Sequence, residues 1–258
     1  MKNILDSLLL SFQFFTAVPV HKELPLTRRT VTGMLSFLPW TGALGGVIAM
    51  FLAYIMSTQS EWSALLISFV IVVTMAIFTG GLHLDGLTDT GDAYFSHRDT
   101  ERRLEILEDP RVGAFGVFTI LFLLIGKLIV LQELLLLDEP PFWAIAFIPL
   151  LARVGMGVYF VLTSCAKEKG LGYFFKGHTN AKLLFVTSIL TSILSICIIF
   201  YVFDVWMAPV ILTFAIVILI FLYRRWTLKN FRGVSGDLLG AFIEGADFIL
   251  WIILLLFI

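Results

Sequence analysis

The stretch GAFGVFTILFLLIGKLIVLQELLLLDEPPFWAIAFIPLLARVGMGVYFVLT, residues 113–163, holds two apolar runs separated by a short turn with acidic residues and prolines. The runs, 113–134 and 141–163, are each as long as the roughly 20 residues that an α-helix needs to cross a hydrocarbon core about 30 Å thick. The turn between them contains no Lys or Arg. This pattern predicts two membrane-spanning helices joined by a short loop.

The rest of the chain repeats the pattern. Of its 258 residues, 59% are apolar and 14% are charged, and the mean hydropathy is +0.97. Soluble domains carry roughly 25% charged residues, so this composition excludes a soluble globular protein. Further apolar segments of spanning length lie at 31–56, 62–80, 181–203, 206–223 and 238–258. We therefore expect an all-α integral membrane protein with about seven transmembrane helices, folded as one domain over residues 1–258.

The N-terminal segment, residues 1–20, is apolar but is interrupted by Ser7, Ser11 and Gln13, and has no small-residue cleavage site. A short re-entrant or interfacial helix fits it better than a cleaved signal peptide. The two cysteines, Cys165 and Cys197, fit no metal-ligand spacing, and we expect them to serve as apolar filler.

Basic residues occur in alternate loops. The loops at 57–61, 135–140 and 204–205 contain no Lys or Arg, whereas the loops on the opposite side are rich in both. The positive-inside rule makes the basic side cytoplasmic, so we expect a multi-pass protein of the cell membrane whose active site faces the cytoplasm. A net charge of −1 gives no reason to expect nucleic acid as a partner.

The run GGLHLDGLTDTGDAYFS, residues 80–96, places Asp85, Asp89 and Asp92 on one face of a helix at the cytoplasmic boundary. Three like charges on one face call for a cation, and carboxylate oxygens suit Mg²⁺ or Mn²⁺ better than zinc. The alternative is a solvated helix end that pairs with nearby arginines.

A second acidic run, GVSGDLLGAFIEGAD, residues 233–247, carries Asp237, Glu244 and Asp247. Asp237 and Glu244 have the same spacing as Asp85 and Asp92, and both pairs start at the cytoplasmic ends of predicted helices. Facing each other, the two pairs would form a cradle for Mg²⁺ bound to a diphosphate. The alternative is a set of unrelated interfacial acids.

Basic residues that could bind phosphate occur in loops and within spans. Arg102, Arg103 and Arg111 flank the loop in which Asp109 lies, where they could fork onto phosphate or anchor to lipid headgroups. Arg153 lies inside a predicted span and could reach a bound phosphate or pair with an aspartate. Lys127, also within a span, is expected to be structural, with Glu133 as a possible partner.

An acidic Mg²⁺ site ringed by arginines suits transfer from a diphosphate-activated amphiphile to an alcohol. Two rival functions are a CDP-alcohol phosphotransferase of lipid metabolism and a secondary transporter. The first requires Ala-Arg after its Asp-Gly pair, where this chain has Leu87, Thr88 and Asp89. The second would place acids in the middle of its spans, and we expect none there.

Several motifs together resemble one family. These are TAVPV at 16–20, FLPWTGALGG at 37–46, GGLHLDGLTDTGDA at 80–93, RRLEILEDPRVGAFG at 102–116 and GVSGDLLGAFIE at 233–244. Their order across the chain resembles the adenosylcobinamide-GDP ribazoletransferases, also called cobalamin synthases. The resemblance implies a Mg²⁺-dependent membrane enzyme in which α-ribazole or its 5′-phosphate attacks adenosylcobinamide-GDP and GMP is released. A homo-oligomer is possible.

Residues are assigned to roles on these grounds. We expect His83, Asp85, Asp89 and Asp92 to be catalytic; Asp85, Asp89, Asp92, Asp237 and Glu244 to bind metal; and Arg102, Arg103, Asp109, Arg111, Arg153 and Ser235 to bind substrate. The sequence departs from the family pattern at Leu107 and Glu108, where Met and Lys are usual, and at Ser235, which keeps the hydroxyl of the usual Thr.

Overall fold

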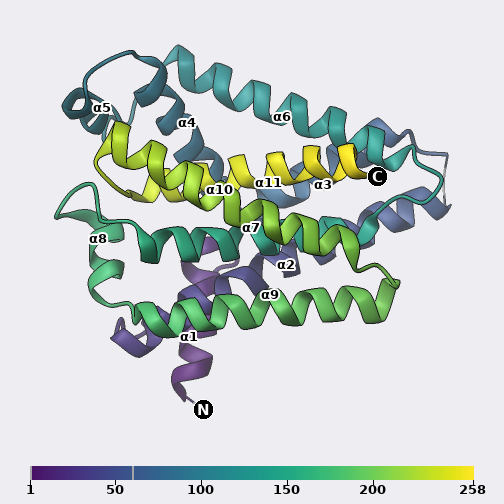
Figure 1. Ribbon diagram of the computed structural model, residues 1–258, viewed down its shortest axis with the longest axis horizontal. Helices are drawn as coiled ribbons and strands as arrows, with labels where there is room; N and C mark the ends of the chain where they lie inside the picture. The colour runs from purple at the N-terminus through teal and green to yellow at the C-terminus, as the bar shows by residue number, and fades with distance from the viewer. Residues whose placement is uncertain (1, 60) are drawn as a thin grey trace.

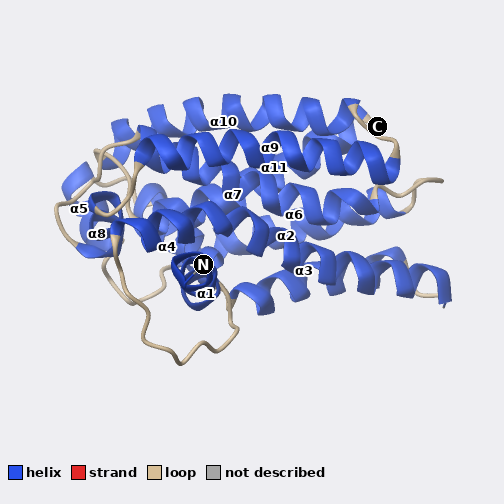
Figure 2. Ribbon diagram, turned by 90° about the horizontal axis from the view of Figure 1, so that it is seen from below, coloured by secondary structure: helices blue, strands red, loops and turns tan. Residues whose placement is uncertain are grey.

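The computed structural model describes residues 2–59 and 61–258, and its regular elements are helices (Figures 1 and 2). In chain order they are α1 (Lys2–Phe15), α2 (Arg28–Gln59), α3 (Ala64–Thr79), α4 (Leu82–Phe95), α5 (Thr100–Ile106), α6 (Ala114–Leu135), α7 (Phe142–Leu162), α8 (Gly170–Gly177), α9 (Ala181–Phe203), α10 (Met207–Phe231) and α11 (Gly236–Phe257). The predicted all-α architecture is confirmed.

Six of the helices, α2, α6, α7, α9, α10 and α11, are long and apolar enough to cross a membrane. The seventh predicted span, 62–80, is different. Helix α3 ends at Thr79, and the chain then bends by 93° into α4. The described chain therefore has six candidate spans, or seven if the bent pair counts as one.

The bend between α3 and α4 is made by two glycines. Gly80 and Gly81 have φ of +63° and +74°, a left-handed conformation that strains residues with a side chain. Gly80 is the C-cap of α3, and Gly81 precedes the first turn of α4. As a result, the acidic helix α4 turns away from the direction of α3 instead of continuing it (Figure 1).

Helix α7 lies at the centre of the bundle and most of its residues are buried. The small residues of α2 let it pack closely against α7. A Cβ on Gly46 would lie 2.3 Å from the carbonyl oxygen of Ile145. A Cβ on Gly42 would lie 2.3 Å from Cδ of Arg153, so Gly42 provides the space that this buried arginine occupies.

The short N-terminal helix is present. Helix α1 runs across the direction of the long helices (Figures 1 and 2) and packs on α2, where a Cβ on Gly33 would lie 2.3 Å from Oγ of Ser7. Its 14 residues are too short to span a membrane. Ile4 and Leu5 on its outer side are exposed, as expected for an interfacial helix.

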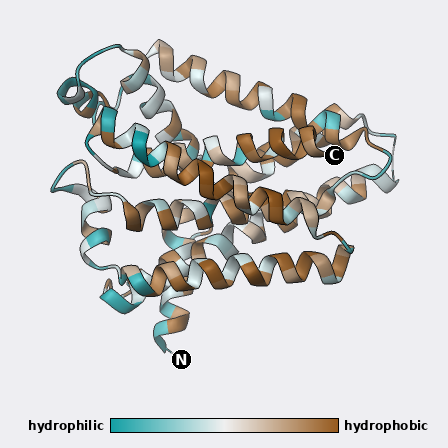
Figure 3. Cartoon of the chain, viewed as in Figure 1, coloured by the Kyte–Doolittle hydropathy of each residue, from teal (hydrophilic) through white to brown (hydrophobic). Residues whose placement is uncertain are grey.

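Hydrophilic residues gather at the end of the bundle that carries α5 and α8 (Figure 3). At this end the loops before α8 and before α11 form a short parallel bridge, in which Val234 N donates to Ser164 O at 2.8 Å and Ala166 N donates to Val234 O at 2.9 Å. Lys176 of α8 donates to the carbonyls of Val161 and Thr163 at the end of α7. These contacts fix α8 beside the start of α11.

Candidate active site

The two acidic segments predicted from the sequence lie side by side, because α4 packs closely on α11. A Cβ on Gly86 would lie 2.7 Å from the carbonyl oxygen of Asp237, and one on Gly240 would lie 3.1 Å from the carbonyl oxygen of His83. Glycine at both positions allows the backbones of the two helices to touch. Asp85, which precedes Gly86, is thereby brought beside the first turn of α11.

Three carboxylates converge at this crossing. Asp85 and Asp237 line the same cavity, and the negative charges of Asp85, Asp237 and Asp92 all act on Asp89. Asp85 is exposed, and Asp89 and Asp237 are partly buried. No basic side chain forms an ion pair with any of these three within the described part of the chain. Asp85, Asp89 and Asp237 therefore form a site with excess negative charge that is open to a cationic ligand.

Asp92 has a different environment from its neighbours in α4. Its Oδ2 accepts a hydrogen bond from Gly113 N at 2.6 Å, and its Oδ1 accepts one from Gly116 N at 2.8 Å. Gly113 is the N-cap of α6 and has no side chain to bind the free amides of the first turn. The carboxylate of Asp92 supplies this cap from another helix.

We expect Asp92→Ala to lower the free energy of unfolding by about 1 to 2 kcal/mol, because buried amides of α6 lose their acceptor. The unfolding temperature in detergent, compared with that of Asp92→Asn, which keeps one acceptor oxygen, measures this effect. An unchanged unfolding temperature in Asp92→Ala would contradict the capping role of Asp92.

Arg153 and His83 are in contact beneath this crossing. Both are buried, and Nη2 of Arg153 lies 3.4 Å from Nδ1 of His83. Nη1 of Arg153 donates to Pro149 O at 2.9 Å. Within the described residues Arg153 thus forms no ion pair with an aspartate, and its expected contact with a bound phosphate stays a prediction.

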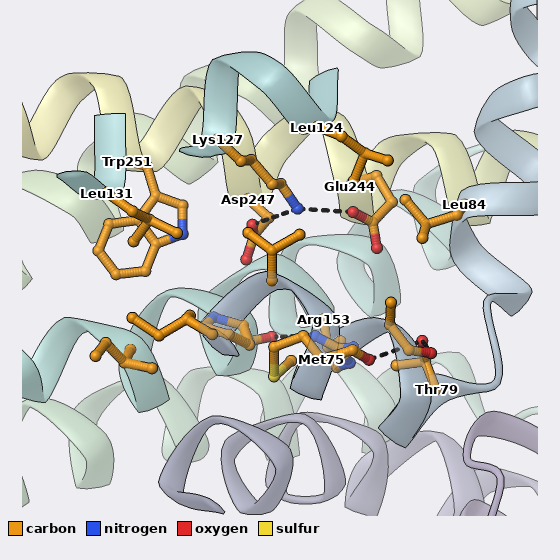
Figure 4. A pocket seen from close by; sticks show the side chains of 15 residues that line it. Met75, Thr79, Leu84, Leu124, Lys127, Leu131, Arg153, Glu244, Asp247 and Trp251 are labelled. Atoms are coloured by element: carbon orange, nitrogen blue, oxygen red, sulfur yellow. Dashed lines mark hydrogen bonds and ion pairs between the residues drawn. The ribbon is translucent and has the colours of Figure 1, made fainter. Parts of the chain in front are cut away.

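A further set of buried charges lies in the middle of the bundle, around a cavity of about 40 Å³ (Figure 4). Lys127 Nζ of α6 lies 2.7 Å from Glu244 Oε2 and 2.8 Å from Asp247 Oδ2 of α11. The expected partner, Glu133, was wrong: Lys127 lies near the middle of its helix and faces α11. The expectation that no acid lies in the middle of a span was also wrong, because Glu244 and Asp247 are buried there beside Lys127.

The two acidic pairs of the predicted cradle do not group into a metal site within the described residues. Glu244 is bound to Lys127 and Asp92 caps α6. Among residues 2–59 and 61–258 no three His, Cys, Asp or Glu side chains group closely enough to hold a metal ion by themselves. Equal spacing along two helices places residues on matching faces. It does not reveal whether a third helix supplies other partners for those residues. Here α6 binds one residue of each pair.

The loop arginines form local contacts at the surface. Arg102 pairs with Glu105 at 2.5 Å, and Arg111 donates two hydrogen bonds to Asp109, which lower the pKa of Asp109 from 3.8 to about 2. Arg103 binds Asn230 at 2.8 Å and covers the ring of Tyr94.

Ser235, the remaining residue expected to bind substrate, caps α11 through a hydrogen bond from Leu238 N. It also lines a cavity at the start of that helix. A role in substrate binding stays a prediction for Ser235, as for the loop arginines.

Two cavities flank the carboxylates. The lysine cavity, of about 280 Å³, lies between the loops before α8 and α11 and is lined by Lys167, Lys169, Glu108 and Ser235 among others. The aromatic cavity, of about 250 Å³, lies between α1, α4, α7, α8 and α11, with Phe14, Phe160 and Phe175 in its wall. Leu171, Gly172, Gly236 and Asp237 line both.

Glu108 is one of the residues that depart from the family pattern, and its contacts account for an acidic residue at this position. Its carboxylate pairs with Lys167 at 2.7 Å and with Lys169 at 3.3 Å, and these pairs lower its pKa. Lys167 also donates to Leu104 O at 2.7 Å. Glu108 therefore ties the loop after α5 to the loop before α8.

Comparison with known proteins decides the family. The family described as cobalamin-5-phosphate synthase matches residues 7–255. This chain belongs to that family. A relative from Geobacillus sp. (strain WCH70) is 35% identical over 97% of this chain and 95% of its own length. Relatives from Halalkalibacterium halodurans and Clostridioides difficile are 34% and 30% identical over 97% and 96% of this chain, and 95% and 97% of their own lengths. All three are named adenosylcobinamide-GDP ribazoletransferase.

No solved structure matches the chain significantly. The resemblance to the cobalamin synthases that the motifs suggested is confirmed. The comparisons support neither of the rival functions, the CDP-alcohol phosphotransferase and the transporter. Membership of the cobalamin-5-phosphate synthase family, and not the position of the acids, is what argues against transport, since Glu244 and Asp247 do lie in the middle of α11.

Sequence reasoning missed two features of this family member. The first is the pair Lys167 and Lys169 in the lysine cavity, which the sequence marked only as part of a basic loop. The second is the carboxylate cap on α6. The only indication of this cap in the sequence is the pattern Gly113-Ala-Phe-Gly116. A helix that begins with glycine has no side-chain cap of its own.

Proposed function

We propose that this chain transfers the adenosylcobinamide phosphate group from adenosylcobinamide-GDP to α-ribazole or its 5′-phosphate, at the crossing of α4 and α11. The main support is the match to relatives of that name over nearly the whole length of both chains. Asp237 lines two adjoining cavities and Asp85 lines one of them, and the charges of both act on Asp89, which supports the location.

The transfer exchanges one phosphate bond for another. A hydroxyl of the acceptor attacks the phosphorus attached to adenosylcobinamide, the bond from that phosphorus to the bridging oxygen breaks, and GMP leaves with this oxygen. The proton of the hydroxyl passes to a base. Asp237 faces both cavities, so its carboxylate is placed to orient the hydroxyl and accept this proton.

We propose Mg²⁺ as the cofactor, held by Asp85 and Asp89. Mg²⁺ is commonly bound through one or two carboxylates together with substrate phosphates, not by a complete protein cage. The described residues fit this, because they offer converging carboxylates but no group of three that could hold a metal ion alone. When bound, the ion would neutralise charge on the diphosphate. Asp85 and Asp89 would hold it, and Asp237 would face the acceptor.

Purified protein, incubated with adenosylcobinamide-GDP and α-ribazole 5′-phosphate, tests the proposed function. We expect GMP and adenosylcobalamin 5′-phosphate to form in equal amounts with Mg²⁺, and neither to form with a chelator. Product formation that is unaffected by the chelator would remove Mg²⁺ from the proposal. GMP release with adenosylcobinamide phosphate as the corrinoid product, in place of adenosylcobalamin 5′-phosphate, would indicate a hydrolase.

The cell membrane is the proposed location, with the end that carries α5 and α8 in the cytoplasm, because basic residues gather in its loops.

In a protein whose Cys165 and Cys197 are replaced by alanine, we expect Thr100→Cys to react with an impermeant thiol reagent only in inverted vesicles. Gln59→Cys, at the opposite end, should react only in intact cells. Labelling of both from the same side would contradict the topology.

A further inference from the structure

The two cavities meet at the residues that form the proposed site. We propose that they form a single cleft for the nucleotide acceptor, with the aromatic base in the aromatic cavity, the sugar hydroxyl at Asp237 and the 5′-phosphate in the lysine cavity. This inference rests on the proposed function and adds to it the orientation of the acceptor and the residues that distinguish α-ribazole 5′-phosphate from α-ribazole.

The order of groups in the cleft matches the order in a nucleotide. The sugar of a nucleotide lies between its base and its phosphate. Asp237 lies between the two cavities because it lines both, and it is also the carboxylate placed to orient an attacking hydroxyl. Gly172 and Gly236, which line both cavities as well, have no side chain that would separate them.

The aromatic cavity suits a planar apolar base. The rings of Phe14 and Phe175 meet edge to face at 5.3 Å, and Phe160, Met156 and Ile243 complete an apolar wall. Its volume of about 250 Å³ exceeds the roughly 150 Å³ of a cavity that holds benzene, so a bicyclic aromatic base has room there. The corrin macrocycle is far larger, so the donor's corrinoid part cannot enter.

One polar atom in this wall has no partner. His83 is 3% exposed, and its Nε2 makes no hydrogen bond in the described structure. A guanidinium nitrogen can only donate, so the contact with Arg153 makes Nδ1 of His83 the acceptor and leaves the ring proton on Nε2. His83, which lines the cavity, therefore carries a buried N–H donor that has no partner in the described structure.

The N–H group of His83 favours the base of the acceptor over the guanine of adenosylcobinamide-GDP. The base of α-ribazole is dimethylbenzimidazole, which is apolar except for one ring nitrogen with a free lone pair, and this nitrogen can accept from His83 Nε2. Guanine has several polar groups on its edge, and an apolar cavity would leave most of them without partners, at a cost in free energy.

The lysine cavity suits a phosphate monoester. The ammonium groups of Lys167 and Lys169 both reach Glu108 at its rim, so they lie close together. The charge of Lys167 also acts on Asp237. Glu108 and Asp237 are the carboxylates of this cavity, and the side chain of Glu108 is 51% exposed. A phosphate dianion can thus replace Glu108 as the partner of the two lysines.

The phosphate half of the cleft is tested with two acceptors. For the wild type, Lys167→Ala and Lys169→Ala, kcat/KM is measured with α-ribazole 5′-phosphate and with α-ribazole, and the ratio of the two values is compared. We expect each substitution to lower the ratio by about threefold to tenfold, since one charged contact to phosphate is lost. Glu108→Gln should raise the ratio, because it removes a competing carboxylate.

Lys182→Ala is the matched control, since Lys182 is an exposed lysine at the start of α9 that lines neither cavity. Both acceptors are assayed with the same preparation of each variant. A change in the amount of folded or inserted protein therefore cancels in the ratio of the two kcat/KM values. Ratios for Lys167→Ala and Lys169→Ala that equal the control would overturn the placement of the phosphate, as would a fall of the ratio in Glu108→Gln.

The base half is tested by filling the aromatic cavity. Leu239 is partly buried in its wall, so Leu239→Trp adds bulk there. We expect KM to rise several-fold for both acceptors. The ratio of their kcat/KM values should stay that of the wild type. A rise in KM for adenosylcobinamide-GDP alone would mean that the donor occupies this cavity. The proposed function fails separately, if the wild type forms no product with either acceptor.

Discussion

Replacing Asp85 by asparagine is expected to lower kcat by about 100-fold or more, because groups that bind metal or move protons typically contribute factors of this size. Asp85 is exposed and forms no ion pair in the described structure, so the substitution removes charge without disturbing packing. Turnover is measured as GMP release in detergent or reconstituted vesicles.

Asp89→Asn is expected to have a similar effect, because Asp89 lies within reach of the charges of Asp85 and Asp237. Glu105→Gln is the matched control, since Glu105 is an exposed acid that pairs with Arg102 on the surface of α5. Both aspartate variants should insert and unfold as the wild type does. A rate close to that of the wild type at low Mg²⁺ would remove the substituted residue from the proposed site.

The largest effect on stability is expected for Lys127→Met. This change leaves the carboxylates of Glu244 and Asp247 buried without their cation, and breaking a buried ion pair in this way costs about 3 kcal/mol or more. For a protein of this size each kcal/mol shifts the unfolding temperature by roughly 2 to 4 °C. The unfolding temperature in detergent therefore measures the effect.

The triple variant Lys127→Met, Glu244→Gln and Asp247→Asn is the informative companion, because it removes all three charges together. We expect it to recover much of the lost stability. If Lys127→Met is as stable as the wild type, the three side chains do not form the buried pairs described. If the triple variant is as unstable as the single one, the loss comes from packing and not from uncompensated charge.

The sequence predicts the architecture well because hydropathy alone sets the lengths of membrane-spanning helices. Six predicted spans match long helices within a few residues, although α10 extends to Phe231. The segment 62–80 was predicted as a span of its own, but α3 has only 16 residues and counts as a candidate span only together with α4. The two glycines that end it were visible, but a Gly-Gly pair marks a flexible point and does not specify a bend of 93°.

The candidate site was predicted only in part. Spacing placed Asp85, Asp89 and Asp237 on helix faces at one end of the bundle, and the packing of α4 on α11 brings these faces together. Periodicity within a helix says nothing about the neighbours of its other faces. For that reason the partners of Asp92, Glu244 and Lys127, all formed across α6, could not be predicted.

Asp237 gives the most direct test that the site lies where α4 crosses α11, since it is the residue that α11 contributes to the proposed site. The measurement is the rate of GMP release by Asp237→Asn with both substrates and Mg²⁺, in protein that unfolds at the wild-type temperature. A site shared by the two helices predicts a loss of about 100-fold or more. Asp237→Asn that releases GMP at the wild-type rate would contradict it.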